Sequence, residues 1–213
     1  MKYIYKSNNQ NYLSKYGELS SGYIEAKKSK FYCYIFNVDN QDVIDNYLNK
    51  IKEDNKTARH IVYLYSYADS NNNQIFKYTE DHEPQGTALK EIINIISKQN
   101  ITNVLIVIVR YFGNILLGTG LLSRCYKNSY VNATSSLNKV ILYECKTLEI
   151  NIKYSYIDDV LNYIRKYNSN KSEPIVEILD IKYLDYINLK LNIQSQYYDE
   201  FNKDLDMLLK KNY

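Results

Sequence analysis

The chain has 213 residues, of which 45% are hydrophobic and 24% charged, a balance typical of a globular protein and not of a disordered one. Its 27 basic and 24 acidic residues leave a net charge of +3. Because this overall charge is too small to attract nucleic acid by itself, binding to nucleic acid would require a local basic patch. The three cysteines are scattered, no apolar run approaches a membrane span and the N-terminal residues lack a secretion leader, so we expect a cytoplasmic protein with reduced thiols and no membrane contact.

Up to Cys145 the chain alternates between strand patterns and helix patterns. Apolar spacing predicts strands at 32–38, 58–67, 75–79, 101–109 and 140–145, and helices at 41–52, 89–96 and 121–134. The strand at 101–109 is apolar on both faces, which is typical of a central strand covered on both sides. These patterns predict a first domain over residues 1–145, with helices packed on a sheet.

Beyond Cys145 the order of elements changes. Apolar spacing predicts a strand at 148–152, a helix at 157–164, strands at 175–181 and 187–193, and a closing helix at 198–209. The order βαββα is typical of part of a ferredoxin-like sandwich, which predicts a small second domain over residues 146–213. The expected fold class is therefore α+β with two domains.

A glycine-bearing loop joins the strand at 101–109 to the helix at 121–134. Gly113, Gly118 and Gly120 lie where unpaired backbone N–H groups and the helix dipole favour an anion. Their spacing matches neither the Walker loop nor the dinucleotide fingerprint. A tight turn from strand to helix, without a ligand, explains the same glycines equally well.

Three arginines strengthen the anion interpretation. Arg110 ends the central strand, Arg124 lies one turn into the following helix, and Arg59 begins an earlier strand beside His60. Guanidinium groups bind phosphate in a bidentate manner, so their convergence on a helix N-terminus would form a phosphate site. The alternative is that Arg124 is a solvated helix residue and that Arg59 pairs with a nearby carboxylate.

The acidic segment Glu80-Asp81-His82-Glu83 could bind a metal or transfer a proton. Its residues are consecutive, however, and no distant His or Cys pair completes a tetrahedral set. We therefore expect Asp81 and Glu83 to cap a helix and to pair with Arg59 or Arg110, and we predict no metal, no cofactor and no catalytic residue. A nucleophile formed by Cys125 and His60 is less favoured, because a single Cys within a helix is usually a packed residue.

Three segments together resemble one protein family. They are Thr57-Ala58-Arg59-His60, Asp81-x-Glu83-Pro84-x-Gly86-Thr87-Ala88, and Arg110-Tyr111-Phe112-Gly113-x-x-x-Leu117-Gly118-Thr119-Gly120-x-x-x-Arg124-x-Tyr126. In this order and at these separations they are similar to the YigZ/IMPACT family. The third segment alone is a strong match, and the resemblance extends over most of the chain.

The resemblance carries expectations about fold and function. It implies a first domain like the second domain of a small-subunit ribosomal protein, and a second domain similar to the last domain of elongation factor G. The eukaryotic relatives regulate translation, and contact with nucleic acid or the ribosome is the usual inference for this fold.

Some positions depart from the family pattern. His82, Asn114 and Leu121 stand where the family usually has glycine, and Leu116 stands where it has a basic residue. The missing glycines and the missing cation weaken the expectation of a tight phosphate clamp.

These observations predict a non-enzymatic regulator related to translation that binds RNA or a ribosome-associated partner, with no sequence-specific DNA binding. The predicted anion-binding residues are Arg59, His60, Arg110, Gly113, Gly118, Thr119, Gly120 and Arg124, and the predicted supporting residues are Asp81, Glu83, Pro84, Gly86 and Thr87. The alternative is an enzyme that handles nucleotides or phosphate with the same loop. A third possibility is a regulatory protein–protein module. The oligomeric state does not follow from the sequence.

Overall fold

The computed structural model describes residues 2–8, 14–69, 71, 73–169, 171 and 173–210. The chain divides into two compact units, Met1–Leu142 and Tyr143–Tyr213. Within the described ranges no helix combines the length and the hydropathy that crossing a membrane requires.

The first unit is built on a five-stranded antiparallel sheet. Its strands, in spatial order, are β2 (Ser20–Ala26), β3 (Ser29–Asn37), β6 (Val104–Tyr111), β4 (His60–Ala68) and β5 (Gln74–Thr79). Every residue of β6 from Val104 to Arg110 is buried. The predicted central strand is therefore the middle strand of this sheet.

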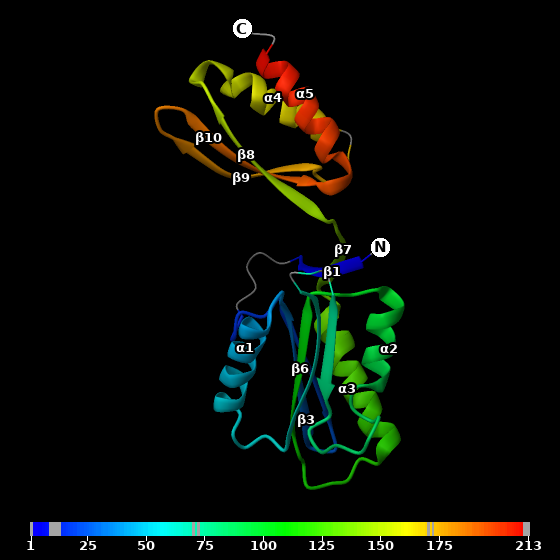
Figure 1. Ribbon diagram of the computed structural model, residues 1–213. Helices are drawn as coiled ribbons and strands as arrows, with labels where there is room; N and C mark the ends of the chain where they lie inside the picture. Colours follow the sequence, from blue (N-terminus) through cyan, green and yellow to red (C-terminus); the bar gives the residue numbers. More distant parts are fainter. Residues whose placement is uncertain are drawn as a thin grey trace. The chain divides into compact units, whose positions relative to one another are not determined.

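Helices cover both faces of the sheet (Figure 1). The helix α1 (Gln41–Asp54) packs on one face, and α2 (Lys90–Gln99) and α3 (Thr119–Thr134) pack on the other. Successive β6 side chains serve opposite faces: Leu105 and Val107 lie in the α1 core, whereas Ile106 and Ile108 lie in the core below α2 and α3. This double burial is why β6 has no polar face in the sequence.

Two strands of the first unit do not have a clear sequence signal. The strand β1 (Lys2–Ser7) pairs with β7 (Leu137–Leu142) in a separate antiparallel sheet. The edge strand β2 contains Gly22, where an added Cβ would lie 2.3 Å from the carbonyl oxygen of Ser129. Glycine is unfavourable in strands, yet here it allows α3 to lie against β2, so the packing overrides the local propensity.

The second unit has the predicted βαββα order. It consists of β8 (Cys145–Ile152), α4 (Ile157–Asn168), β9 (Val176–Tyr183), β10 (Ile187–Gln194) and α5 (Tyr198–Lys210), with short 3₁₀ helices η1 (Tyr154–Tyr156) and η2 (Ser195–Tyr197). The sheet order is β8-β10-β9, with both pairs antiparallel. Apolar residues of the helices and strands form one core. The predicted two-domain α+β class is confirmed. The domain boundary predicted after residue 145 falls at the first residue of β8.

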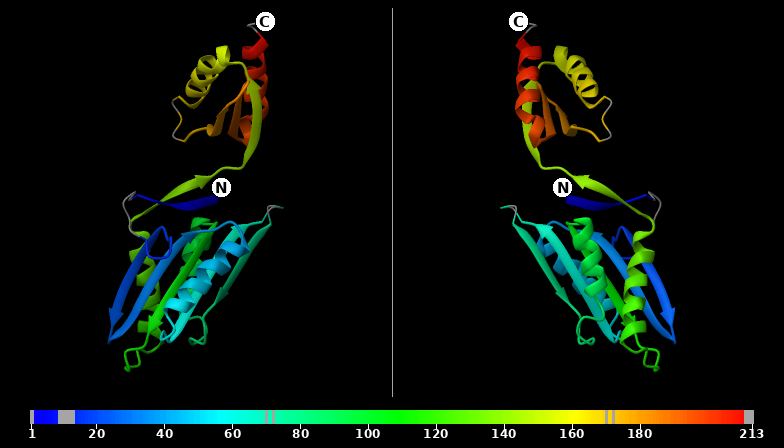
Figure 2. Two further views of the ribbon diagram at one scale, coloured as in Figure 1. Left: turned by 90° about the vertical axis from the view of Figure 1, so that its left-hand side faces the viewer. Right: turned by 90° about the vertical axis from the view of Figure 1, so that its right-hand side faces the viewer.

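Three connections of the first unit lie at the same end of its sheet. Figure 2 shows the loop after β6 and the segment between β5 and α2 at this end in both views, and β4 begins here too. The three sequence segments with unusual composition therefore meet in space.

Candidate functional site

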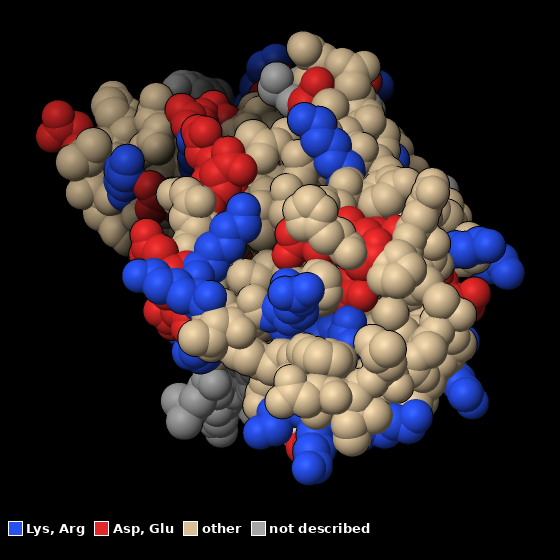
Figure 3. Space-filling model, turned by 90° about the horizontal axis from the view of Figure 1, so that it is seen from below, with Lys and Arg blue, Asp and Glu red and all other residues tan. Residues whose placement is uncertain are grey.

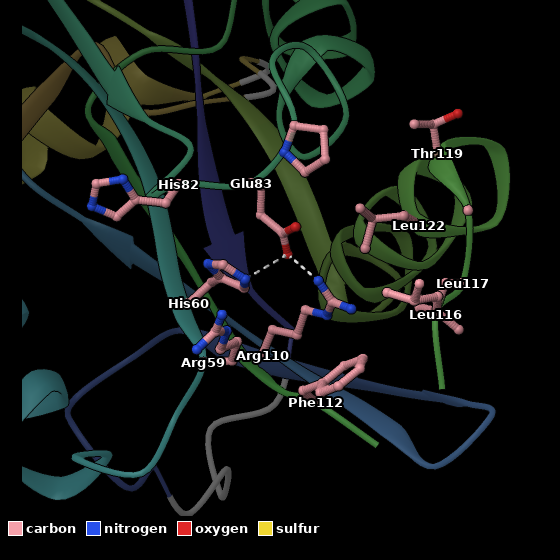
Figure 4. Close-up of a pocket in the computed structure, with 12 residues that line it drawn as sticks. Arg59, His60, His82, Glu83, Arg110, Phe112, Leu116, Leu117, Thr119 and Leu122 are labelled. Atoms are coloured by element: carbon pink, nitrogen blue, oxygen red, sulfur yellow. Dashed lines mark hydrogen bonds and ion pairs between the residues drawn. The ribbon is translucent and has the colours of Figure 1, made fainter. Parts of the chain in front are cut away.

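A pocket with a volume of about 630 Å³ lies at this end of the first unit. Its lining, shown in Figure 4, consists of Arg59, His60, His82, Glu83, Pro84, Arg110, Phe112, Leu116, Leu117, Gly118, Thr119 and Leu122. Volumes of this size are typical of pockets that hold small ligands.

The floor of the pocket is a buried ion pair. Arg110 at the end of β6 donates from Nη1 to Oε1 of Glu83 at 2.5 Å, and the two side chains are only 7% and 2% exposed. The Nε atom of Arg110 is buried without a hydrogen-bond partner. The sequence predicts Arg110 as an anion-binding residue, and in the structure its guanidinium group is buried and paired with a carboxylate, so the anion-binding role stays a prediction. The expected pairing of Glu83 with Arg110 is confirmed.

Two further side chains contact the same carboxylate oxygen of Glu83. The hydroxyl of Tyr126 on α3 donates to Oε1 at 2.6 Å, and Nε2 of His60 on β4 lies 3.7 Å from it. Burial raises the pKa of Tyr126 well above its usual value, and the neighbouring Glu83 raises it further. Glu83 thus joins β4, β6 and α3 through one oxygen.

A left-handed turn brings Glu83 into this position. Asp81 and His82 have φ values of 43° and 63°, a region that is unfavourable for residues with a side chain. The carboxylate of Asp81 accepts from the backbone N–H of Ile61 at 2.6 Å, and its carbonyl oxygen lies 2.6 Å from Nδ1 of His60. Asp81 therefore fastens the turn to β4, in place of the arginine pairing expected from the sequence.

Glu80 organises the entry to α2, a role that sequence reasoning missed. Its carboxylate accepts from the backbone N–H groups of Gly86, Ala88 and Leu89 at 2.5, 3.0 and 3.0 Å. Gly86 and Ala88 belong to the loop before α2 and Leu89 is the N-cap of the helix, so Glu80 holds the loop and the helix start together. The acceptor lies six to nine residues before its donors, farther than any capping motif, so no local spacing could have identified it.

Gly86 and Thr87 also belong to this connection. Gly86 has a φ of 74°, which glycine adopts without steric cost. The hydroxyl of Thr87 donates to the carbonyl oxygen of Pro84 at 2.5 Å. Both residues shape the loop and lie outside the pocket lining, so their predicted supporting role at the site stays a prediction.

The start of α3 forms the opposite wall. Gly118 is the N-cap, with a φ of 73° and no side-chain hydrogen bond to the helix. An added Cβ on Gly118 or on Gly120 would have no heavy atom within 4 Å. The backbone is therefore open to approach from the pocket side, where the helix dipole favours an anion.

Gly113 has a different role. An added Cβ would lie 2.2 Å from the carbonyl carbon of Lys28, and its N–H donates to Oγ of Ser29 at 3.0 Å. Gly113 therefore lets the loop after β6 pack against the turn between β2 and β3. It was predicted as an anion-binding residue, but the structure uses it for packing.

The remaining two arginines differ in position. Arg59 is exposed at the pocket, and its backbone N–H donates to the carbonyl oxygen of Arg110 at 2.8 Å. Arg124 is also exposed, but it lies outside the lining and donates from Nε to the carbonyl oxygen of Gly120 at 3.3 Å. Figure 3, which views this end, shows acidic as well as basic side chains. The end has mixed charge and is not a uniformly basic patch.

The structure brings together about half of the predicted residues and adds an apolar set. Seven predicted residues line the pocket: Arg59, His60, Glu83, Pro84, Arg110, Gly118 and Thr119. His82 is also part of the lining, and the apolar residues Phe112, Leu116, Leu117 and Leu122 complete it. Sequence reasoning missed them because it searched for charged and flexible residues, although the loop composition does show consecutive leucines.

Two departures from the family pattern have a backbone explanation. His82 and Asn114, which stand where the family usually has glycine, have φ values of 63° and 62°. Glycine adopts this region freely, and His and Asn are among the few other residues that tolerate it. His82 and Asn114 thus adopt a left-handed backbone conformation that glycine would adopt at lower cost.

Comparisons with known proteins support the resemblance. Residues 27–134 match the family model described as the Impact N-terminal domain. An IMPACT family member from Haemophilus influenzae is 28% identical over 85% of this chain and 84% of that protein. The IMPACT family member YvyE from Bacillus subtilis is 30% identical over 67% of this chain and 65% of that protein.

One solved structure shows the same fold, and a second is more distant. The crystal structure of a hypothetical protein covers 96% of this chain and 92% of its own, with 20% identity and a TM-score of 0.60. The two-domain translational regulator Yih1 covers 59% of this chain and 49% of its own, with 18% identity and a TM-score of 0.41. The family match covers all three motifs, so the chain belongs to the IMPACT family, as the motifs predicted.

Proposed function

We propose that this chain regulates translation without catalysing a reaction, by binding RNA or a ribosome-associated partner at the pocket end of its first unit. Family membership supports the translational role, because the resemblance to the eukaryotic IMPACT proteins, among them those of Xenopus tropicalis and Danio rerio, implies a part in translation. The loops around the pocket favour a binding role. Internal hydrogen bonds hold them in place, and the pocket between them is open to solvent.

The observation that carries the proposal is the meeting of three distant segments around one pocket. Arg59 comes from the start of β4, Glu83 from the segment before α2, and Gly118 and Thr119 from the start of α3. Arg59 and the α3 backbone are open to a partner, whereas Arg110 supports them from below. Arg124 extends the exposed cationic surface by one helical turn.

The alternative, an enzyme acting on phosphate, has less support. Phosphoryl transfer requires a carboxylate placed to hold Mg²⁺, and Glu83 is the pocket's carboxylate. Its Oε1 already accepts from Arg110 and Tyr126. In the part of the chain that the structure describes, no three His, Cys, Asp or Glu residues are grouped closely enough to hold a metal ion.

Co-sedimentation with bacterial ribosomes tests the proposal. The full chain should sediment with ribosomes at low salt and dissociate as salt rises, because phosphate contacts release counterions. Arg59→Glu should reduce the bound fraction, whereas Arg165→Glu, a matched change on α4 of the second unit, should not. The proposal fails if the wild-type chain stays in the supernatant at low salt, or if both variants sediment like wild type.

A further inference from the structure

The pocket has an unusually exposed apolar edge. Phe112, Ile115 and Leu116 are 39%, 43% and 83% exposed, and all three lie in or beside the loop between β6 and α3. Leu117 and Leu122 are buried behind them and also line the pocket. Clustered apolar exposure of this kind usually marks a binding surface.

The ring of Phe112 lies against the guanidinium group of Arg110. The guanidinium carbon of Arg110 lies 5.7 Å from the Phe112 ring centroid and 5.5 Å from the Phe31 ring centroid. Since Glu83 fixes Arg110 in turn, the exposed part of the Phe112 ring is presented to the pocket as a preorganised flat surface. Such surfaces stack on unpaired nucleic-acid bases.

Cationic and N–H groups lie beside this apolar edge. In Figure 4 the terminal nitrogen of Arg110 that does not contact Glu83 points toward Leu117, on the pocket side. The buried Nε of this arginine has no partner. Gly120 lies in the first turn of α3, where glycine is unfavourable, and no neighbour within 4 Å requires it. A group that approaches the helix start closely would explain why glycine is present there.

The net charge of the pocket lining is complementary to a ligand with one negative charge. Among the Arg, Lys, Asp and Glu side chains of the lining, Arg59 and Arg110 are opposed by Glu83 alone, which leaves an excess of one cation. A phosphodiester carries one negative charge, whereas a terminal phosphate carries nearly two at neutral pH. The lining therefore fits a phosphate inside a nucleic-acid strand better than a free nucleotide.

Further cations lie next to the loop. Lys27 and Lys28 are exposed on the turn between β2 and β3, and Gly113 packs directly against the backbone of Lys28. Cations flanking the pocket allow neighbouring phosphates of the same strand to be contacted.

We infer that the pocket receives one unpaired nucleotide of an RNA strand, with its base against Phe112 and Leu116, its phosphodiester at the first N–H groups of α3, and a neighbouring phosphodiester of the strand at Arg59. This inference rests on the proposed function, because it names the ligand of the same site. A base within a duplex is stacked on both faces, so a single-stranded segment is required.

Fluorescence anisotropy with the full chain tests the inference. The probes are a labelled ten-nucleotide single-stranded RNA, the same RNA as a duplex, and an abasic strand of equal length. Single-stranded RNA should bind most tightly, and Phe112→Ala should weaken it roughly tenfold, since stacking of one base is lost. Phe112→Tyr keeps the ring and should restore most of the affinity. Phe76→Ala, which removes an aromatic ring of equal exposure (40%) on β5, should have no effect.

The salt dependence tests the phosphate contact separately. Arg59→Ala should reduce the slope of log affinity against log salt by about 0.7, the value for one phosphate of a single strand. Arg165→Ala on α4 should leave the slope unchanged. Thermal unfolding of every variant shows whether the fold is retained.

The possible failures can be told apart. If the abasic strand binds as tightly as RNA, or if a folded Phe112→Ala variant binds like wild type, no base is recognised and the inference is overturned, while anion binding remains. If the chain binds no RNA but sediments with RNase-treated ribosomes in an Arg59-dependent manner, the partner is a protein; the inference is overturned and the proposed function stands. If neither RNA nor ribosomes are bound, both are overturned.

Discussion

Arg110 and Glu83 form a buried ion pair that connects the central strand to the segment before α2, with 2.5 Å between Nη1 and Oε1. The pair supports the pocket from below. It fixes the guanidinium against Phe112 and, through Tyr126, reaches α3. The most strongly hydrogen-bonded residues of the motifs therefore shape the site, and Arg59 and the α3 backbone face the ligand.

Removing the carboxylate should destabilise the fold. Glu83→Gln leaves the Arg110 charge buried without a counter-ion, so the free energy of unfolding should fall by about 3–5 kcal/mol. The control is Glu91→Gln, which removes an exposed pair with Lys127 at 3.8 Å and should cost less than about 1 kcal/mol. Urea unfolding measures both. Equal effects for the two variants would show that the buried pair does not stabilise the fold.

Two glycines of the loop region should respond in opposite directions to alanine. Gly113→Ala places a Cβ 2.2 Å from the carbonyl carbon of Lys28, so it should lower the free energy of unfolding by about 1–3 kcal/mol. Gly120→Ala meets no atom within 4 Å and should raise it by about 1 kcal/mol, because alanine is the better helix former. A destabilising Gly120→Ala would mean that the helix start requires glycine for a structural reason.

The left-handed residues should tolerate glycine better than the residues now present. His82→Gly and Asn114→Gly relieve φ values of 63° and 62°, and each should raise the free energy of unfolding by up to about 1 kcal/mol. Gln85→Gly, at an exposed position of the same segment without a positive φ, should lower it instead. Chemical denaturation compares the three. A loss of stability in both left-handed variants would refute the strain at these positions.

The thiol of Cys125 should be unreactive. Burial raises its pKa, although Arg110 and Arg124 act in the opposite direction, so less thiolate is present at a given pH. Iodoacetamide at pH 8 should modify the exposed Cys145 before Cys125 and the buried Cys33, as peptide mass spectrometry can show. Preferential modification of Cys125 would reopen the nucleophile hypothesis.

Local patterns predicted the elements that bury a regular apolar face. The strand β6 and the helices α1 and α4 follow directly from the spacing of their apolar residues. In contrast, β1 is stabilised by pairing with β7, more than a hundred residues away, and β2 carries Gly22 for contact with α3. Such long-range requirements leave no periodic signal in a short window.

The sequence indicated which segments line the candidate pocket, but it did not indicate which of their residues are exposed and which are buried. Residue type and spacing identified Arg59 and Arg110, but only the fold shows that one is exposed and the other is buried against Glu83. The exposure of Leu116 is likewise a property of the folded loop, because an apolar residue in a sequence is expected to be buried.

The central claim is that the ligand's phosphate binds at the start of α3. Amide NMR spectra of the ¹⁵N-labelled full chain during titration with single-stranded RNA test it directly. We expect concentrated shifts at the amides of Thr119, Gly120 and Leu121, whereas the amides at the start of α4, an acidic helix N-terminus in the second unit, should stay in place. Saturable RNA binding that leaves the three α3 amides unshifted would contradict the account.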